Sequence, residues 1–162
     1  MFRREVLEKA ALKADAAQVY LRSSSSTPVR FAANKLKTLE TRDARSLTLR
    51  IIHSGRVGIA STSKFEDADW VVEAALAAAE FGPEARFEFA DPAANPEVDV
   101  FDPRTPAHAV EDMVEASREI VDLLRQHESD LNIDVGLDKE VERTVIAGGA
   151  GELAYERSSY GG

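Results

Sequence analysis

The sequence predicts an α+β fold: a mostly antiparallel sheet, made of a meander plus C-terminal strands, with helices packed on one face. Three observations support this. Residues 18–60 alternate apolar and polar side chains with a period of two. Two segments with helical spacing follow, and residues 130–155 then alternate again. With 162 residues and 44% hydrophobic content, the chain is long enough for one domain, residues 1–162.

The first half of the chain reads as one helix followed by the meander. Residues 2–14 have apolar side chains at helical spacing, and the alternating segments come after them. Ser23–Ser26 is expected to be a polar connection between two strands, and Asn34–Lys35 a tight turn. Ser54–Gly55 is expected to be a second turn, leading into a returning strand.

A capping box predicts the next helix. Ser63 and Glu66 have the spacing in which each side chain accepts a hydrogen bond from the other residue's amide. An alanine-rich helical segment follows and ends at Gly82–Pro83. Acidic residues in its first turn complement the helix dipole. Trp70 and the phenylalanines are assigned to the core.

A loop and a second helix follow. Residues 83–105 are rich in proline, alanine, asparagine and aspartate and are expected to be a crossing loop. Thr105 is a candidate N-cap with Pro106 at the first helical position, for a helix to about Gln126. Its apolar stripe comprises Val110, Met113, Val114, Ser117, Ile120, Val121 and Leu124.

The C-terminal part predicts three more strands. They are residues 130–138, residues 141–147 and a strand starting near Leu153 and Tyr155, with a glycine-rich turn at 148–151 between the last two. Because the sequence stops at Gly161–Gly162 during or just after this strand, we expect a truncated chain.

The charge balance excludes some functions. A net charge of -9 repels phosphate, so we expect no nucleic-acid partner. No apolar run reaches the length of a membrane span, and no secretory signal opens the chain. The absence of cysteine fits a cytoplasmic protein.

No residue is assigned to catalysis, to a cofactor or to a metal. The histidines, His53, His108 and His127, are not one helical turn apart, as a hydrolytic zinc site usually requires. His127 is interpreted as a solvent-facing residue near a helix C-terminus. No serine lies in a Gly-x-Ser-x-Gly frame, and residues 148–151 lack the Lys-Ser/Thr of a phosphate loop.

The carboxylates have structural interpretations. Glu66, Asp67 and Asp69, like Glu111 and Asp112, lie at predicted helix starts. A third set, Asp130, Asp134 and Asp138, lies on one side of an alternating strand and is interpreted as a solvated face.

Three segments carry a family resemblance. Residues 29–40, VRFAANKLKTLE, resemble the early strand pair of TldD/PmbA proteins, a strand, an Asn turn and a strand ending near Glu. Residues 46–63 resemble the hairpin of that family, and residues 72–79 its alanine-rich helix. A weaker similarity continues through residues 99–103 and the helix beyond Thr105.

The resemblance implies an amino-terminal domain of a cytoplasmic zinc peptidase system. Such a domain would serve assembly and enclosure, or would bind unfolded peptides as added strands. In this family a zinc-bearing subunit pairs with a homologous zinc-free subunit, so a hetero- or homodimer with a homologous subunit is expected. The zinc motif, His-Glu-x-x-x-His, belongs to the second half of the family and has no match here. Zinc would belong to the full-length parent or its partner, and the loop at 89–103 looks slightly more like the PmbA branch.

The peptide hypothesis requires an unpaired strand edge, and residues 130–138 are the proposed edge. The alternative from a different class is a stand-alone acidic interaction domain with no enzymatic parent. A small-molecule carrier is a third possibility and would require a large apolar pocket.

Overall fold

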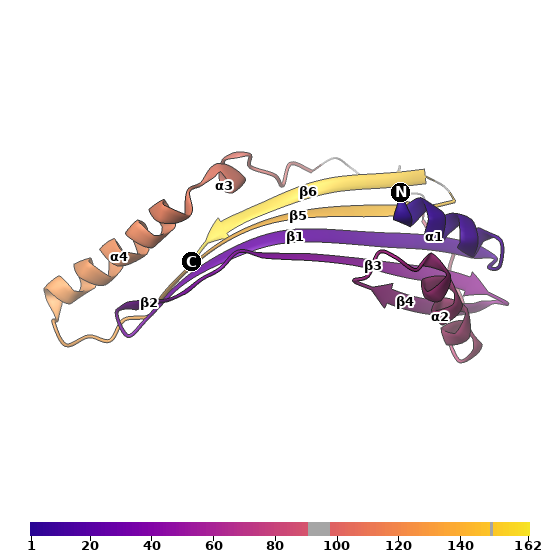
Figure 1. The fold of residues 1–162 in the computed structure, drawn as a ribbon, viewed down its shortest axis with the longest axis horizontal. Helices are drawn as coiled ribbons and strands as arrows, with labels where there is room; N and C mark the ends of the chain where they lie inside the picture. Colours follow the sequence, from indigo (N-terminus) through magenta and orange to yellow (C-terminus); the bar gives the residue numbers. More distant parts are fainter. Residues whose placement is uncertain (91–97, 150) are drawn as a thin grey trace. The chain divides into compact units, whose positions relative to one another are not determined.

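A computed structural model describes residues 1–90, 98–149 and 151–162. The six strands of these residues form one antiparallel sheet in the order β4-β3-β1-β5-β6, and β2 pairs with β1 off this path. The predicted α+β fold is confirmed (Figure 1). The elements are α1 (Phe2–Ala11), β1 (Ala16–Ala32), β2 (Lys35–Leu39), β3 (Arg42–His53), β4 (Arg56–Thr62), α2 (Ala68–Glu80), α3 (Arg104–Ala107), α4 (Val110–His127), β5 (Val135–Gly148) and β6 (Gly151–Gly161).

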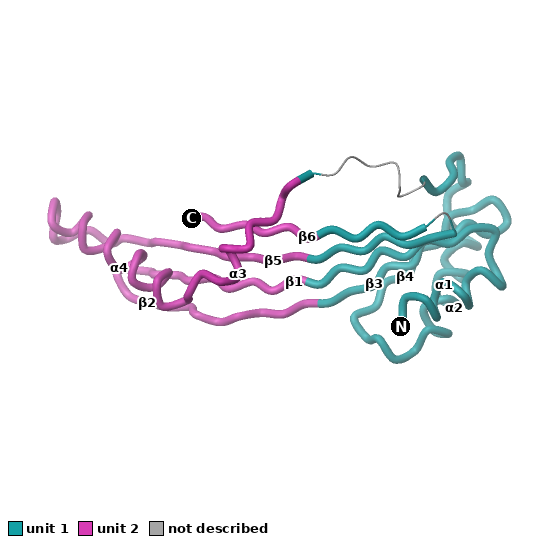
Figure 2. The backbone as a smooth tube through the Cα atoms, turned by 90° about the horizontal axis from the view of Figure 1, so that it is seen from above, with its two compact units in different colours: residues 1–23, 45–98, 143–155 teal, residues 24–44, 99–142, 156–162 magenta. Residues whose placement is uncertain are grey.

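The chain divides into two compact units, coloured teal and magenta in Figure 2. Unit 1 comprises residues 1–23, 45–98 and 143–155, and unit 2 comprises residues 24–44, 99–142 and 156–162. Each unit has its own hydrophobic core.

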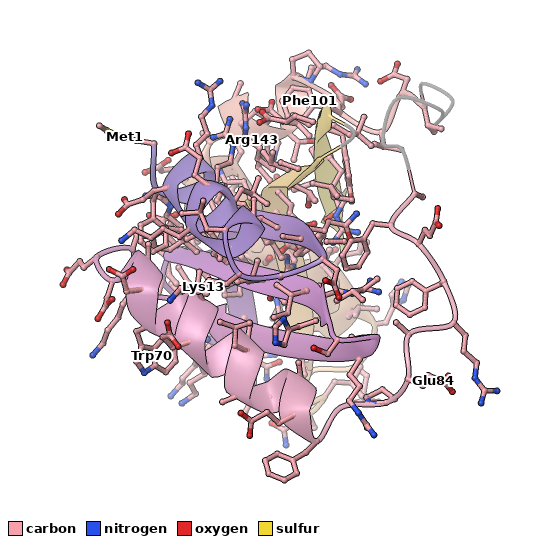
Figure 3. The ribbon with its side chains drawn as sticks, turned by 90° about the vertical axis from the view of Figure 1, so that its right-hand side faces the viewer. Met1, Lys13, Trp70, Glu84, Phe101 and Arg143 are labelled. Carbon is pink, nitrogen blue, oxygen red and sulfur yellow. The ribbon has the colours of Figure 1, made fainter. Side chains whose placement is uncertain are left out.

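In unit 1, α1 and α2 pack on the sheet. The alternating residues Leu47, Leu49 and Ile51 are fully buried beneath the helices, as their period of two predicts. Gly58 on β4 allows α2 to approach closely, since a Cβ there would lie 2.1 Å from the carbonyl oxygen of Ala75. Two ion pairs connect this region to α2: Lys9 of α1 pairs with Asp69 at 2.6 Å, and Lys13, just after α1 and labelled in Figure 3, pairs with Glu73.

In unit 2, helix α4 packs against the sheet and contributes to the hydrophobic core. Its residues Met113, Ser117 and Val121 are buried, and Met113 and Val121 pack with Val29 and Phe31 of β1. The buried Ser117 hydroxyl is satisfied because it donates to the carbonyl oxygen of Met113 at 2.8 Å. Of the predicted stripe, Ile120 and Leu124 are wrong as core residues, because both remain about two-fifths exposed, at 41% and 40%.

The predicted connection at Ser23–Ser26 is wrong, because these serines lie inside the continuous strand β1. Strands on both sides of β1 satisfy its backbone, so serine's preference for turns is overridden. The strand pairing beside β1 is interrupted instead at Glu40–Thr41, the two residues between β2 and β3. It lies beside Thr27, whose hydroxyl bonds that of Thr41 at 2.9 Å, and beside Pro28, which has no N–H to donate to a ladder.

Two hairpin turns have left-handed residues. The first turn consists of Ala33 and Asn34, with φ of 48° and 65°, so the predicted position at Asn34–Lys35 is wrong by one residue. Two successive positive φ values are the signature of a two-residue hairpin turn. The turn at Ser54–Gly55 is confirmed, with φ of 50° and 73°.

The predicted capping box is wrong. Helix α2 begins at Ala68, and Asp67 is its N-cap, accepting a hydrogen bond from the amide of Trp70 at 2.9 Å. Asp67 is as good a cap as serine, and it lies next to the first buried residue of the helix. Trp70 is wrong as a core residue because 54% of it is exposed, and Phe81 and Phe87 are wrong for the same reason. The predicted end near Gly82 is close to the observed end at Glu80.

The segment from Thr105 onward is not one helix. Thr105 lies inside the short helix α3, whose N-cap is Pro103, and α4 starts separately at Val110 after an extended His108. A loop was expected at 83–105. Its described residues up to Pro103 form no helix and no strand, and only Glu84 makes an isolated bridge, to Arg56. Residues 91–97 lie outside the described residues.

The two strands predicted at 130–138 and 141–147 are a single strand, β5, which starts only at Val135. Asp134 does not pair in the sheet; its side chain accepts a hydrogen bond from the amide of Ala33 at 2.8 Å. The predicted glycine turn agrees with the end of β5 at Gly148 and the start of β6 at Gly151, although Ala150 lies outside the described residues.

Candidate peptide-binding edge

The sheet has three borders at which another strand could add, and two of them are poor candidates. At β4 the first residues are already covered within unit 1. The amide of Val57 donates to the carbonyl oxygen of Pro83 at 2.9 Å, and the amide of Ala85 donates to that of Gly55 at 2.7 Å.

The border at β2 has features that hinder strand addition. This strand has five residues, and its register with β1 shifts so that Lys37 is left without a partner across the ladder. Lys35 and Lys37 are both exposed on it. A short, bulged, lysine-bearing edge is how native sheets avoid pairing with other chains.

The third border, β6, is the best candidate. The last part of β6, within unit 2, is already covered by residues 100–102. The Ser158 amide donates to the carbonyl oxygen of Val100 at 3.0 Å, and the Ser158 hydroxyl accepts a hydrogen bond from the amide of Asp102 at 2.8 Å. For the preceding residues, Gly151–Tyr155, no described residue occupies the border away from β5. This stretch, which we call the β6 edge, contains no proline or lysine and is exposed except for the half-buried Leu153.

An ion pair fixes the β6 edge to helix α1. Glu152 accepts the guanidinium of Arg3 through both carboxylate oxygens, at 2.8 and 3.1 Å. Two parallel N–H···O bonds hold a carboxylate in one orientation. Helix α1 therefore holds the β6 edge in place. If an extended peptide paired with this edge, the entropy cost of ordering its backbone would be smaller.

The edge proposed from sequence, residues 130–138, is wrong. β5 lies between β1 and β6 and offers no border. Asp138 was predicted to be solvated. Its two carboxylate oxygens instead accept hydrogen bonds from Nη2 of Arg30, at 2.8 and 2.7 Å. The alternation at Leu153 and Tyr155 did predict the β6 strand, but a local pattern cannot show which strand will be outermost, because order in a sheet depends on distant pairing.

The histidines do not come together into a site. His53 ends β3, His108 packs its ring against Tyr160 at 4.7 Å, and His127 is the exposed last residue of α4, as predicted. Among residues 1–90, 98–149 and 151–162, no group of three His, Asp or Glu side chains could hold a metal ion.

The carboxylates predicted at helix starts lie there except for Glu66, which precedes the N-cap of α2 and is outside the helix. Asp67 caps α2, Asp69 lies in its first turn, and Glu111 and Asp112 lie in the first turn of α4. Asp102 has a pKa below its usual value because the Arg104 side chain donates hydrogen bonds to it. The Lys9 pKa is raised chiefly by its hydrogen bond to Asp69. Both shifts belong to exposed ion pairs, and neither leaves a poised acid or base in a cleft.

Unit 2 also has an open hollow beside α3. It is lined by residues 99–105 and 158–160, and two of its charged side chains, Asp102 and Arg104, pair with each other at 2.7 Å. Small-molecule sites are usually enclosed and mostly apolar, so this hollow does not favour a carrier. Within the described residues, no helix combines the length and apolarity needed to cross a membrane.

Residues 17–79 match the family model described as PmbA/TldA metallopeptidase domain 1. These residues comprise β1 to β4 and nearly all of α2. A comparison with curated proteins finds no match.

Solved structures share the fold at low identity. This chain superposes on a candidate modulator of DNA gyrase from Bacteroides thetaiotaomicron with a TM-score of 0.84 and a sequence identity of 18%. The values are 0.81 and 15% for a candidate modulator of a DNA gyrase from Thermotoga maritima, and 0.81 and 14% for TldE from Thermococcus kodakarensis.

These matches cover 98%, 98% and 99% of this chain but only 38%, 37% and 38% of the respective relatives. The chain thus spans less than two-fifths of the structures it resembles. Residues 17–79 thus resemble the first domain of the PmbA/TldA metallopeptidases, and the chain shares its fold with the solved structures of TldE and of the candidate gyrase modulators.

Proposed function

We propose that this chain is a non-catalytic amino-terminal domain of a TldD/PmbA-type metallopeptidase, and that it holds unfolded peptide substrates by strand addition at the β6 edge. Proteolysis, and any zinc it uses, would belong to polypeptide outside these residues or to a homologous partner subunit. The supporting observation is the border at Gly151–Tyr155, which an ion pair from Arg3 holds and which no residue in the described part of the chain occupies.

The chemistry of the edge suits a substrate of variable sequence. Main-chain hydrogen bonds supply affinity without reading side chains, because every residue except proline offers the same N–H and C=O groups. β6 is a single strand, so alternate residues present their amides to one border. Since Ser158 donates away from β5 to Val100, the amide of Ala154 is expected to face the same open border.

Proline at residue 154 tests the proposal. Ala154→Pro removes the outward donor, and proline is tolerated on an edge strand when its missing N–H faced solvent. Ala154→Val, the matched control, keeps the donor and the strand propensity. Binding of a labelled extended peptide would be followed by fluorescence anisotropy, and the affected residues would be mapped by amide chemical shifts.

Wild type and Ala154→Val should bind the peptide and show shift changes at residues 151–155, whereas Ala154→Pro should lose most of the affinity. Equal binding by Ala154→Pro, with an unchanged melting curve, would contradict strand addition at this border. Shift changes confined to another surface would contradict it as well.

A further inference from the structure

Arg50 of unit 1 makes no hydrogen bond and no ion pair with any described residue, although the chain has 29 acidic side chains. It lies on β3 between the fully buried Leu49 and Ile51, so its side chain points to the face of the sheet opposite α1 and α2. A guanidinium is always charged and carries five N–H donors. Because Arg50 is half-buried, its lack of a partner requires an explanation.

Two aromatic rings cover part of the guanidinium. The Arg50 Cζ lies 5.2 Å from the ring centroid of Phe87 and 5.2 Å from that of Phe89, and the two rings are 6.0 Å apart. Nε of Arg50 is closed off from solvent without a partner, whereas its two terminal nitrogens are not closed off. An anion can therefore reach the terminal nitrogens. Beside the rings, where water is partly excluded, its attraction to the guanidinium is stronger than in open water.

The surface beside Arg50 is apolar. Ile59 of β4 lies directly opposite Arg50 in the antiparallel ladder, and 52% of it is exposed. Phe87, on which the guanidinium stacks, is 44% exposed. A ligand with an apolar group next to its anionic group would cover Ile59 and Phe87 while the anion meets Arg50. Burial of this apolar surface would add to the affinity.

Nearby carboxylates limit the charge of the ligand. Phe89 also lines a hollow of about 400 Å³, and Asp15 and Glu88 are among the other residues that line it. Two negative side chains beside the site repel a doubly charged anion more strongly than a singly charged one. A carboxylate also matches the planar guanidinium, since its two oxygens can accept two parallel N–H bonds. These features favour a monocarboxylate over a phosphate.

We propose that Arg50 anchors a binding site for monocarboxylates that carry an apolar group. The carboxylate would accept hydrogen bonds from the terminal nitrogens of Arg50, and the apolar group would lie against Ile59 and Phe87. This chemistry is found in small aromatic acids and at the C-terminus of a peptide that ends in an apolar residue. The site does not include the β6 edge and does not rest on the proposed strand addition there.

An NMR titration of the 162-residue chain with 3-phenylpropionate tests the proposal. The Nε–H resonance of Arg50, identified by its loss in Arg50→Lys, and the methyl resonances of Ile59 should shift and saturate. A dissociation constant on the order of millimolar is expected for so small a ligand. 3-Phenylpropionamide has nearly the same shape without the charge, and it should bind at least about tenfold more weakly. Inorganic phosphate should also bind more weakly than the acid.

Three variants separate the role of Arg50 from that of positive charge in general. Arg50→Gln should abolish binding, and Arg50→Lys should weaken it about tenfold because the planar pair of donors is lost. Arg45→Gln is the matched control and should bind as wild type does. Arg45 is also on β3, with its Cζ 4.9 Å from the ring of Phe65, but it is exposed to solvent. Circular dichroism melts establish that each variant folds.

A dipeptide distinguishes the two sources of the carboxylate. If peptide C-termini bind, N-acetyl-Ala-Phe should shift the same resonances, and its C-terminal amide should not. Binding of 3-phenylpropionate alone would assign the site to small acids. A wild-type chain whose Arg50 and Ile59 resonances do not shift, or shift equally with 3-phenylpropionate and its amide, would overturn the proposal. Unchanged binding by folded Arg50→Gln, or an equal loss in Arg45→Gln, would overturn it as well.

Discussion

Asn34 and Ile133 are joined by hydrogen bonds in both directions. The Asn34 amide donates to the carbonyl oxygen of Ile133 at 3.1 Å, and the Ile133 amide donates to Oδ1 of Asn34 at 3.0 Å. Asn34 also donates from Nδ2 to the carbonyl oxygen of Leu131 at 2.8 Å. The turn of the first hairpin thereby holds the strand-free segment before β5.

Replacing Asn34 should separate its two roles, since it is both left-handed and a hydrogen-bonding side chain. Asn34→Gly keeps the backbone conformation and loses the side-chain bonds, at a cost of about 1–2 kcal/mol. Asn34→Ala loses the bonds and also strains the turn, so it should cost roughly 1 kcal/mol more. Urea unfolding measures both. Equal stability of the two variants would show that the left-handed conformation costs nothing here.

Gly58 should resist enlargement. A Cβ would lie 2.1 Å from the carbonyl oxygen of Ala75 and 2.9 Å from the Ala79 Cβ, so Gly58→Ala must push α2 away from β4. We expect a loss of about 1–3 kcal/mol or more, as for other overpacked sites. Gly149→Ala is the control, since nothing lies within 4 Å of its added Cβ, and it should be nearly neutral. Thermal melts compare the two, and a neutral Gly58→Ala would mean that α2 is not held against β4.

The strands and the long helix were largely predictable, because alternation at Leu47 to Ile51 and helical spacing at Met113 to Val121 record which side of an element is buried. The errors occur where distant pairing decides. Ser23–Ser26 have turn propensity, yet the strands beside β1 keep them extended. Trp70 is apolar, yet it lies outside the core because α2 buries its Val71, Val72 and Ala75 side instead.

The candidate edge was less predictable than the fold. The sequence supplied the idea of an unpaired strand, but it assigned the border to residues 130–138. Only the strand order shows that β5 is interior and β6 is at the border. The support that Arg3 gives Glu152, 149 positions away, leaves no local signal at either residue.

The start of α2 offers a direct test of the competing caps. Asp67→Ala removes the acceptor for the Trp70 amide and should cost about 1 kcal/mol. Ser63→Ala should be nearly neutral, because Ser63 lies outside the helix and is exposed. Unfolding in urea measures the two losses. A larger loss for Ser63→Ala than for Asp67→Ala would restore the capping box that the sequence suggested.

The pair Asp102–Arg104 predicts a pH effect of known sign. The Arg104 side chain bonds both carboxylate oxygens of Asp102, at distances of 2.7 to 3.0 Å, and its amide donates to Oδ1 at 2.9 Å; these bonds hold the carboxyl pKa below its usual 3.8. A lowered pKa stabilises the fold above pH 3.8, and that stability is lost as the pH falls through the lowered value. Arg104→Ala removes the side-chain donors and should move the pKa of Asp102 back toward 3.8, which a carboxyl NMR titration follows directly. Arg104→Lys keeps a positive charge without the two-pronged donor, so its titration should fall between wild type and Arg104→Ala. A titration of Asp102 that does not move in Arg104→Ala would show that the backbone amide of residue 104, rather than the guanidinium, sets the pKa.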